Sequence, residues 1–112
     1  MKITIKSTNI DLTPSLNTFI STKLDSLAKL VKKFNSEGLV TLNLEVARTT
    51  RHHYKGDVFM AEANLKLPGK TLRAVAKNED IRTAIDNMRQ VLGREIEKYK
   101  TQNFPGRSRK DK

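Results

Sequence analysis

The sequence predicts a single α+β domain, a four-stranded sheet with two helices packed on one face, in the order β-α-β-β-β-α. Three observations support this prediction. Two segments repeat apolar residues every three or four positions, as amphipathic helices do. Four segments alternate apolar and polar residues, as half-buried strands do. No linker or internal repeat divides the 112 residues, and a chain of this length can bury a modest core.

The first two elements are predicted to be a strand and a helix. Residues 2–7 alternate, with Ile3 and Ile5 on the face expected to be buried. Thr13 and Pro14 indicate a helix start, because a threonine hydroxyl accepts hydrogen bonds from first-turn amides and proline suits the first helical position. The apolar stripe of this helix is Leu16, Phe19, Ile20, Leu24, Leu27, Val31 and Phe34.

The middle of the chain is predicted to form a second strand and a loop. Residues 35–38 should end the first helix, because Gly38 can adopt the left-handed conformation common at helix ends. A strand follows over residues 40–46, where apolar residues alternate with polar ones. Residues 47–57 lose this alternation and collect basic residues and two histidines, so we predict a long, mobile hairpin loop there.

Two more strands and a long helix complete the predicted fold. A third strand is expected from Val58 to residue 67, and Pro68-Gly69 indicates a tight turn, most simply of type II, into an antiparallel fourth strand. Asn78 is predicted to cap a final helix that reaches about Lys100. The apolar stripe of that helix is Ile81, Ala84, Ile85, Met88, Leu92, Ile96 and Tyr99.

The charge of the chain favours a polyanionic partner. Its 22 lysines and arginines against 12 aspartates and glutamates give a formal net charge of +10. Such a positive field attracts polyanionic partners, most often nucleic acid and less often an anionic membrane surface. Half of the charge lies from Lys98 onward, so we expect a folded domain over residues 1–101 and a basic flexible tail over residues 102–112. The alternative for this tail is a solubilising terminus without a partner.

Several other classes of protein are not expected. The chain has no cysteine, which excludes disulfides and thiolate zinc sites, and no apolar run near the ~20 residues of a membrane span, so we expect a soluble cytoplasmic protein. His52 and His53 point to opposite sides of an extended segment, which disfavours a metal site with Asp57 or Glu45. No phosphate loop or catalytic triad is recognisable, so we predict no enzyme, metal, cofactor or small-molecule substrate.

Cations on both sides of the last apolar stripe favour nucleic-acid binding. The helical repeat places one set near one edge and a second set along the other edge, and these sets are Arg82, Arg89 and Lys100, and Arg94 and Lys98. The alternative is a solvated face, in which Asp86, Glu95 and Glu97 pair with these cations.

The chain also resembles a double-stranded-RNA-binding domain with an added first strand. That fold carries a lysine cluster at the start of its last helix, where this chain has Glu79 and Asp80. Because these carboxylates would repel phosphate, RNA should meet the sides of the helix instead of its start. Tyr54 and Phe104 are the aromatic residues expected to be exposed. Such scarcity favours recognition of RNA backbone or shape over base stacking on the sheet.

Four stretches give a more specific resemblance. They read MKITIKSTNIDLTPSL, NLKLPGKTLRAVA, EDIRTAID and LGREIEKYK. Together they resemble the ribosome hibernation promoting factor family, also called ribosome-associated inhibitors, in its short form. The last two stretches are the most specific, because that family shows an acidic-Asp-apolar-Tyr-x-Ala-Ile-Asp pattern followed by Leu-x-Arg-Gln-x-x-Lys.

The resemblance implies a function in translational silencing. It implies binding to the small ribosomal subunit, through 16S-type rRNA near the decoding centre, where the protein sterically excludes mRNA and tRNA. We expect the free protein to be a monomer without a membrane partner. Four positions depart from the family, because Arg82 replaces a common tyrosine, Glu95 a glutamine, and Ser26 and Val91 frequent lysines. The predicted rRNA-binding residues are Lys23, Lys29, Arg82, Arg89, Arg94, Lys98 and Lys100, and the accessory ones are Lys32, Lys33, Arg48, Arg51 and Lys55.

Two alternatives to ribosome hibernation remain open at this level. One is a general structured-RNA-binding module in transcript regulation or ribosome assembly, which would not compete with mRNA and tRNA on intact subunits. The other is a protein-interaction domain whose charge only solubilises it, which would show no salt-sensitive affinity for RNA.

Overall fold

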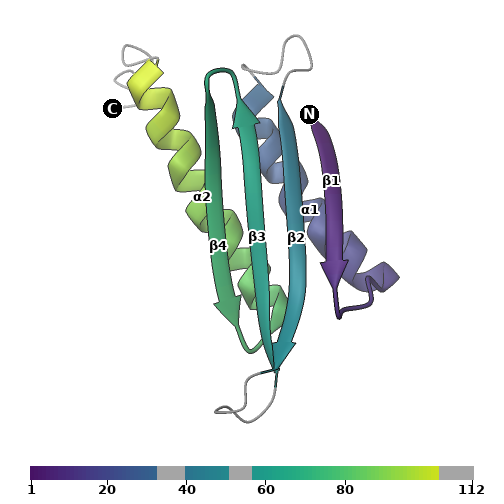
Figure 1. Ribbon diagram of the computed structural model, residues 1–112. Helices are drawn as coiled ribbons and strands as arrows, with labels where there is room; N and C mark the ends of the chain where they lie inside the picture. The colour runs from purple at the N-terminus through teal and green to yellow at the C-terminus, as the bar shows by residue number, and fades with distance from the viewer. Residues whose placement is uncertain (33–39, 51–56, 104–112) are drawn as a thin grey trace.

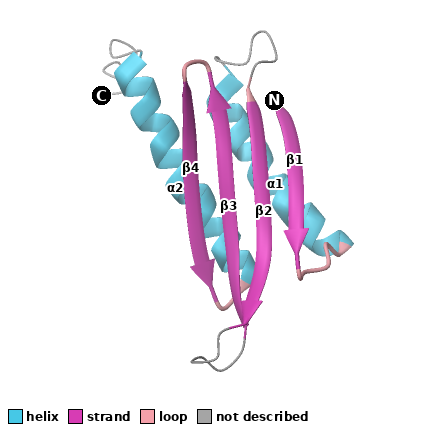
Figure 2. Cartoon of the chain, viewed as in Figure 1, coloured by secondary structure: helices cyan, strands magenta, loops and turns pink. Residues whose placement is uncertain are grey.

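One sheet of four strands with two helices behind it forms the computed structural model, which describes residues 1–32, 40–50 and 57–103 (Figure 1). Both helices cover the same face of the sheet (Figure 2). The elements are β1 Lys2–Thr8, α1 Pro14–Val31, β2 Thr41–Thr50, β3 Asp57–Leu67, β4 Lys70–Asn78 and α2 Ile81–Asn103. The predicted fold class and element order are therefore confirmed.

The sheet is mixed, with the strands in the order β1-β2-β3-β4. β1 pairs with β2 in parallel, and the remaining neighbours are antiparallel. A parallel pair needs a crossover, which α1 supplies, whereas the antiparallel pair of β3 and β4 needs only a tight turn. Gly69 in that turn has a φ of 75°, as the second central residue of a type II turn requires.

The hydrophobic core lies between the sheet and the two helices. The predicted stripes supply it, with Ile20, Leu24, Met88 and Leu92 among the fully buried side chains. Tyr99 is buried as well, and its hydroxyl donates a hydrogen bond of 3.1 Å to the carbonyl of Pro68, which satisfies its polar end. Within the described residues no polar or charged side chain is fully buried, so the charges lie on the surface or at its margin.

The helix starts differ in how well the sequence predicted them. Thr13 caps α1 as predicted, because its Oγ1 accepts a hydrogen bond of 3.1 Å from the N–H of Leu16. The prediction that Asn78 caps α2 is wrong. Asp80 is the cap, since its carboxylate accepts from the N–H of Thr83 at 3.1 Å, while Asn78 ends β4 and its Oδ1 accepts from the N–H of Asp80 at 2.9 Å.

Two strand predictions also need correction. Residues 47–50 and Asp57 were expected in a loop, but β2 and β3 extend through them, with Arg48 opposite Phe59. Cross-strand pairing thus continues where the alternation of apolar residues ends. Ile3 lies opposite the buried Leu42 yet remains 38% exposed, because β1 is an edge strand and α1 runs from the C-terminal end of β1 towards the neighbouring strands (Figure 1).

Candidate nucleic-acid interface

A line of polar contacts between α1 and α2 runs along the centre of the outer surface of the helix layer. We call this line of contacts the seam. Residue numbers rise along both helices in the same order through these contacts, so the two helices run in the same direction. The contacts are Arg82 Nη2 to Ser15 Oγ at 2.8 Å, Lys23 Nζ to Asp86 Oδ1 at 2.7 Å, and Arg89 Nε to Ser26 Oγ at 2.9 Å.

The charges along the seam are not neutralised equally. Lys23 is paired with a carboxylate, whereas Arg82 and Arg89 donate to neutral serine hydroxyls and keep their full charge. Phe19 lies between two of these cations, with its ring centroid 5.1 Å from Lys23 Nζ and 5.4 Å from Arg82 Cζ. The seam therefore presents two guanidinium groups that form no ion pair, with the pair of Lys23 and Asp86 between them, and Asp80 acts electrostatically on Arg82.

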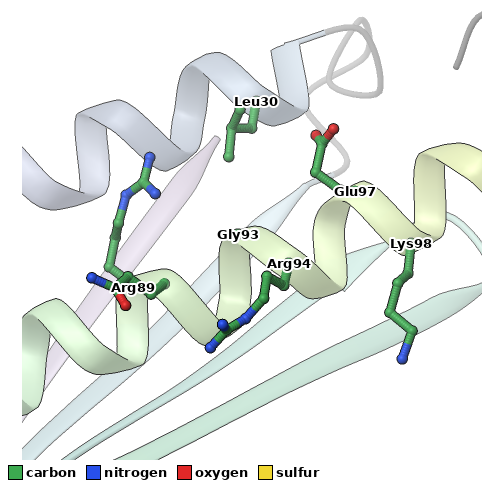
Figure 3. A pocket seen from close by; sticks show the side chains of 7 residues that line it. Leu30, Arg89, Gly93, Arg94, Glu97 and Lys98 are labelled. Atoms are coloured by element: carbon green, nitrogen blue, oxygen red, sulfur yellow. The ribbon is translucent and has the colours of Figure 1, made fainter. Parts of the chain in front are cut away.

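A groove of about 740 Å³ continues from the seam towards the C-terminal part of α2. Arg89 points towards α1 in this region, whereas Arg94 and Lys98 extend away from it, so the cations lie on two sides of α2 (Figure 3). Apolar contact in the groove comes from Leu30 of α1 and from the backbone at Gly93. The groove is lined by Leu30, Arg89, Gln90, Gly93, Arg94, Glu97 and Lys98.

The other predicted rRNA-binding residues lie on the exposed surface of the helices or near it. Lys29 and Arg94 are exposed. Lys98 Nζ lies 3.6 Å from Glu95 and Lys100 Nζ lies 3.3 Å from Glu97, each pair one helical turn apart. These pairs realise part of the solvated-face alternative. Because exposed pairs of this kind typically contribute under about 1 kcal/mol, both lysines can exchange a carboxylate for a phosphate.

The predicted accessory residues are only partly described by the structure. Lys32 is exposed at the end of α1, and Arg48 is exposed in β2 instead of in the expected loop. Lys33, Arg51 and Lys55 lie outside the described residues, as do His52, His53, Tyr54, Phe104 and residues 104–112 of the predicted tail. Residues 102 and 103, which were also assigned to the tail, belong to α2.

Three residues of the seam escaped the sequence-based prediction. Ser15 and Ser26 received no role as partners of cations, and Phe19 was assigned only to the apolar stripe. A signal for them exists, because steps of four and seven residues from Ser15 to Phe19 and on to Ser26 keep all three on one side of a helix. What the sequence lacks is the position of α2 relative to that side.

The outer face of the sheet offers a different surface. In the described strands it carries no aromatic side chain, and its polar groups partly satisfy each other, as in the 2.7 Å contact between Arg73 Nε and Glu62. Val75 is 38% exposed there. Base stacking on this face is therefore not supported, and the helix layer is the stronger candidate interface.

The described ranges hold no group of three metal-ligating side chains. No helix in them has the length and apolar character that crossing a membrane requires.

Known proteins match this chain over most of its length. The family model described as "Sigma 54 modulation protein / S30EA ribosomal protein" matches residues 3–103. The chain is 30% identical over 104 residues to a "Ribosome hibernation promotion factor" from Picosynechococcus, a match that covers 93% of this chain and 51% of that protein. It is 28% identical over 100 residues to a "Ribosome hibernation promoting factor" from Klebsiella oxytoca, covering 89% and 94%. The chain thus spans about half of the first relative and nearly all of the second.

Solved structures share the fold. The N-terminal domain of Thermus thermophilus Protein Y superposes with a TM-score of 0.69 at 19% identity, covering 88% of this chain and 99% of that domain. A protein described as a ribosomal subunit interface protein, from Coxiella burnetii, superposes with a TM-score of 0.63 at 23% identity, covering 90% and 99%. These structures show the fold alone, and the likeness to a double-stranded-RNA-binding domain stays a prediction.

Proposed function

The chain belongs to the sigma 54 modulation protein / S30EA ribosomal protein family, and from this membership we propose that it acts in ribosome hibernation. It binds the small ribosomal subunit through 16S-type rRNA near the decoding centre and excludes mRNA and tRNA from the space that it occupies. No bond is made or broken, so its activity equals its occupancy. The family membership confirms the resemblance read from the sequence, and the names of the relatives support the hibernation role.

The observation that carries the proposal is the unequal pairing of cations on the helix layer. Arg82, Arg89 and Arg94 have no carboxylate within 4 Å among the described residues, and the first two are held by serines. Guanidinium groups of this kind bind phosphate through two parallel hydrogen bonds. A surface that only kept the protein soluble would not need arginines oriented by neutral hydroxyls.

The number of phosphate contacts predicts how steeply the binding constant falls as the salt concentration rises. Each neutralised phosphate makes the slope of log K against log salt concentration more negative by about 0.7 to 0.9. The predicted set of seven cations on α1 and α2 would then give a slope of roughly −5 to −6 if each met one phosphate. The remaining net charge of the chain adds long-range attraction and speeds association.

The proposal is tested by equilibrium binding of labelled protein to purified small subunits at physiological salt, with bulk tRNA as a folded-RNA comparison. We expect Arg94→Glu with Lys98→Glu to abolish subunit binding while the domain stays folded. The matched control, Lys66→Glu with Lys77→Glu, places the same charge change on the outer sheet face, where both lysines are exposed. Equal binding of wild type to tRNA and subunits, or undiminished subunit binding by the α2 variant, would contradict the proposal.

A further inference from the structure

The two serine contacts of the seam repeat one arrangement at two places. In each, an arginine of α2 crosses to a serine of α1 and donates one N–H to its hydroxyl. We propose that Ser15 and Ser26 are positioning residues that hold Arg82 and Arg89 as two separate binding sites for phosphodiester groups of RNA. The inference rests on the proposed function, which supplies the RNA, and adds the residues that organise its binding.

Ser26 is oriented to accept from Arg89. Its own hydroxyl proton is donated to the carbonyl of Lys23 at 2.7 Å, so the lone pairs of the oxygen are left for the Nε–H of Arg89. One of the five N–H donors of the guanidinium is thereby used, and four remain on the two terminal nitrogens. These four can meet two oxygens of one phosphate.

The surroundings of Arg89 strengthen such a contact. Its Nη1 lies 3.4 Å from the point where a Cβ on residue 93 would stand, and Leu30 Cδ1 lies 3.9 Å from the same point. The guanidinium therefore packs directly beside the backbone of Gly93, and Leu30 places an apolar group next to it. A charge beside apolar groups attracts an anion more strongly than one surrounded by water. Glu97, the carboxylate of this groove, is paired with Lys100 at 3.3 Å.

Arg82 is held in two ways. Its Nη2 donates to Ser15 Oγ at 2.8 Å, and its guanidinium carbon lies 5.4 Å from the centroid of the Phe19 ring. Its Nε and Nη1 are not used by Ser15, and Arg82 as a whole residue is exposed. Restricting the side chain in this way lowers the conformational entropy that it loses when it binds a phosphate.

The spacing of the two arginines indicates a polymer instead of a single ion. Seven residues separate the two arginines on α2 and eleven separate Ser15 and Ser26 on α1, which corresponds to roughly 10.5 and 16.5 Å along the two helices. The neutral pair of Lys23 and Asp86 lies between them. The ligand is therefore expected to carry two separate phosphates, as a strand of RNA does.

The test measures the affinity for small subunits and for polyuridylate across a range of salt concentrations. Arg89→Gln should make the negative salt slope less steep by about 0.7 to 0.9, because one phosphate contact is lost. Ser26→Ala should keep the slope and weaken binding about three- to tenfold, as the loss of an orienting hydrogen bond predicts. Ser26→Thr, which keeps the hydroxyl, should restore binding, and Ser15→Ala should behave as Ser26→Ala does.

Ser21→Ala is the matched control, because a rotation of about 140° around α1 places Ser21 away from Ser26 and the seam. Thermal unfolding of each variant separates lost binding from lost folding. Wild-type affinity in folded Ser15→Ala and Ser26→Ala variants would overturn the positioning role and leave the hibernation function standing. Failure of the wild type to bind subunits, with these serine effects still seen on polyuridylate, would overturn the hibernation function and leave the positioning role.

Discussion

Lys23 of α1 and Asp86 of α2 form an ion pair, 2.7 Å from Nζ to Oδ1, between the two serine-held arginines of the seam. Their side chains are 32% and 41% exposed, so water screens the pair and it adds little to stability. Its larger effect is on ligand binding, because the negative charge of Asp86 offsets the positive charge of Lys23. A phosphate that approaches Lys23 must compete with Asp86.

Replacing Asp86 by asparagine is therefore expected to increase RNA affinity. Asp86→Asn frees Lys23 and should tighten binding to small subunits, most strongly at low salt, while the free energy of unfolding changes by less than about 1 kcal/mol. Binding across a salt series and urea unfolding measure the two quantities. Asp25→Asn, an equal charge change at an exposed position of α1, is the control. Equal tightening by both variants would show a general charge effect and no special role for the pair.

Two glycines are expected to respond in opposite ways to the same substitution. Gly93→Ala should stabilise the domain by about 1 kcal/mol, because alanine favours a helix interior and the nearest atom is the flexible end of Arg89 at 3.4 Å. Gly69→Ala should destabilise it by about 1 to 2 kcal/mol, because its φ of +75° is strained for any residue with a Cβ. Urea unfolding measures both, and effects of the same sign would contradict these assignments.

The start of α2 is expected to weaken in acid. The hydroxyl of Thr83, followed by its N–H, donates to Asp80 and holds the pKa of that carboxyl below its usual 3.8. A lowered pKa in the folded state contributes stability above the unfolded value, and this contribution is lost as the pH falls through the folded value.

Comparison of Asp80→Asn with wild type tests this cap. Asparagine also caps helices but does not titrate, so the stability difference between the two proteins should change below pH 3.8 and stay constant near neutrality. Thermal unfolding at a series of pH values gives this difference, with Glu79→Gln as the neighbouring control. A difference that does not vary with pH would show that the carboxylate contributes nothing through its charge.

The fold was predictable because its elements depend on local patterns. Alternation and helical periodicity are read within one segment, and the residues of both apolar stripes that the structure describes lie in the core or against it. The errors arose where a neighbouring element decides. β2 and β3 extend past the end of the alternation because each supplies hydrogen bonds to the other, and Ile3 stays exposed because α1 covers only part of β1.

The candidate site was predictable only as a set of cations. Arg82 and Arg89 could be placed on one side of the last helix from their spacing. That serines would hold them, and that Asp86 would pair with Lys23, depends on how α1 and α2 align along the sheet. This alignment is set by packing across the core, which no single segment encodes.

Sedimentation of the protein with small ribosomal subunits, before and after mRNA and initiator tRNA are bound, tests the steric mechanism most directly. Physiological salt suppresses weak electrostatic attachment in this measurement. We expect the protein to travel with empty subunits and to be displaced when mRNA and tRNA are present. Equal sedimentation with empty and occupied subunits would contradict steric exclusion and favour general binding to structured RNA.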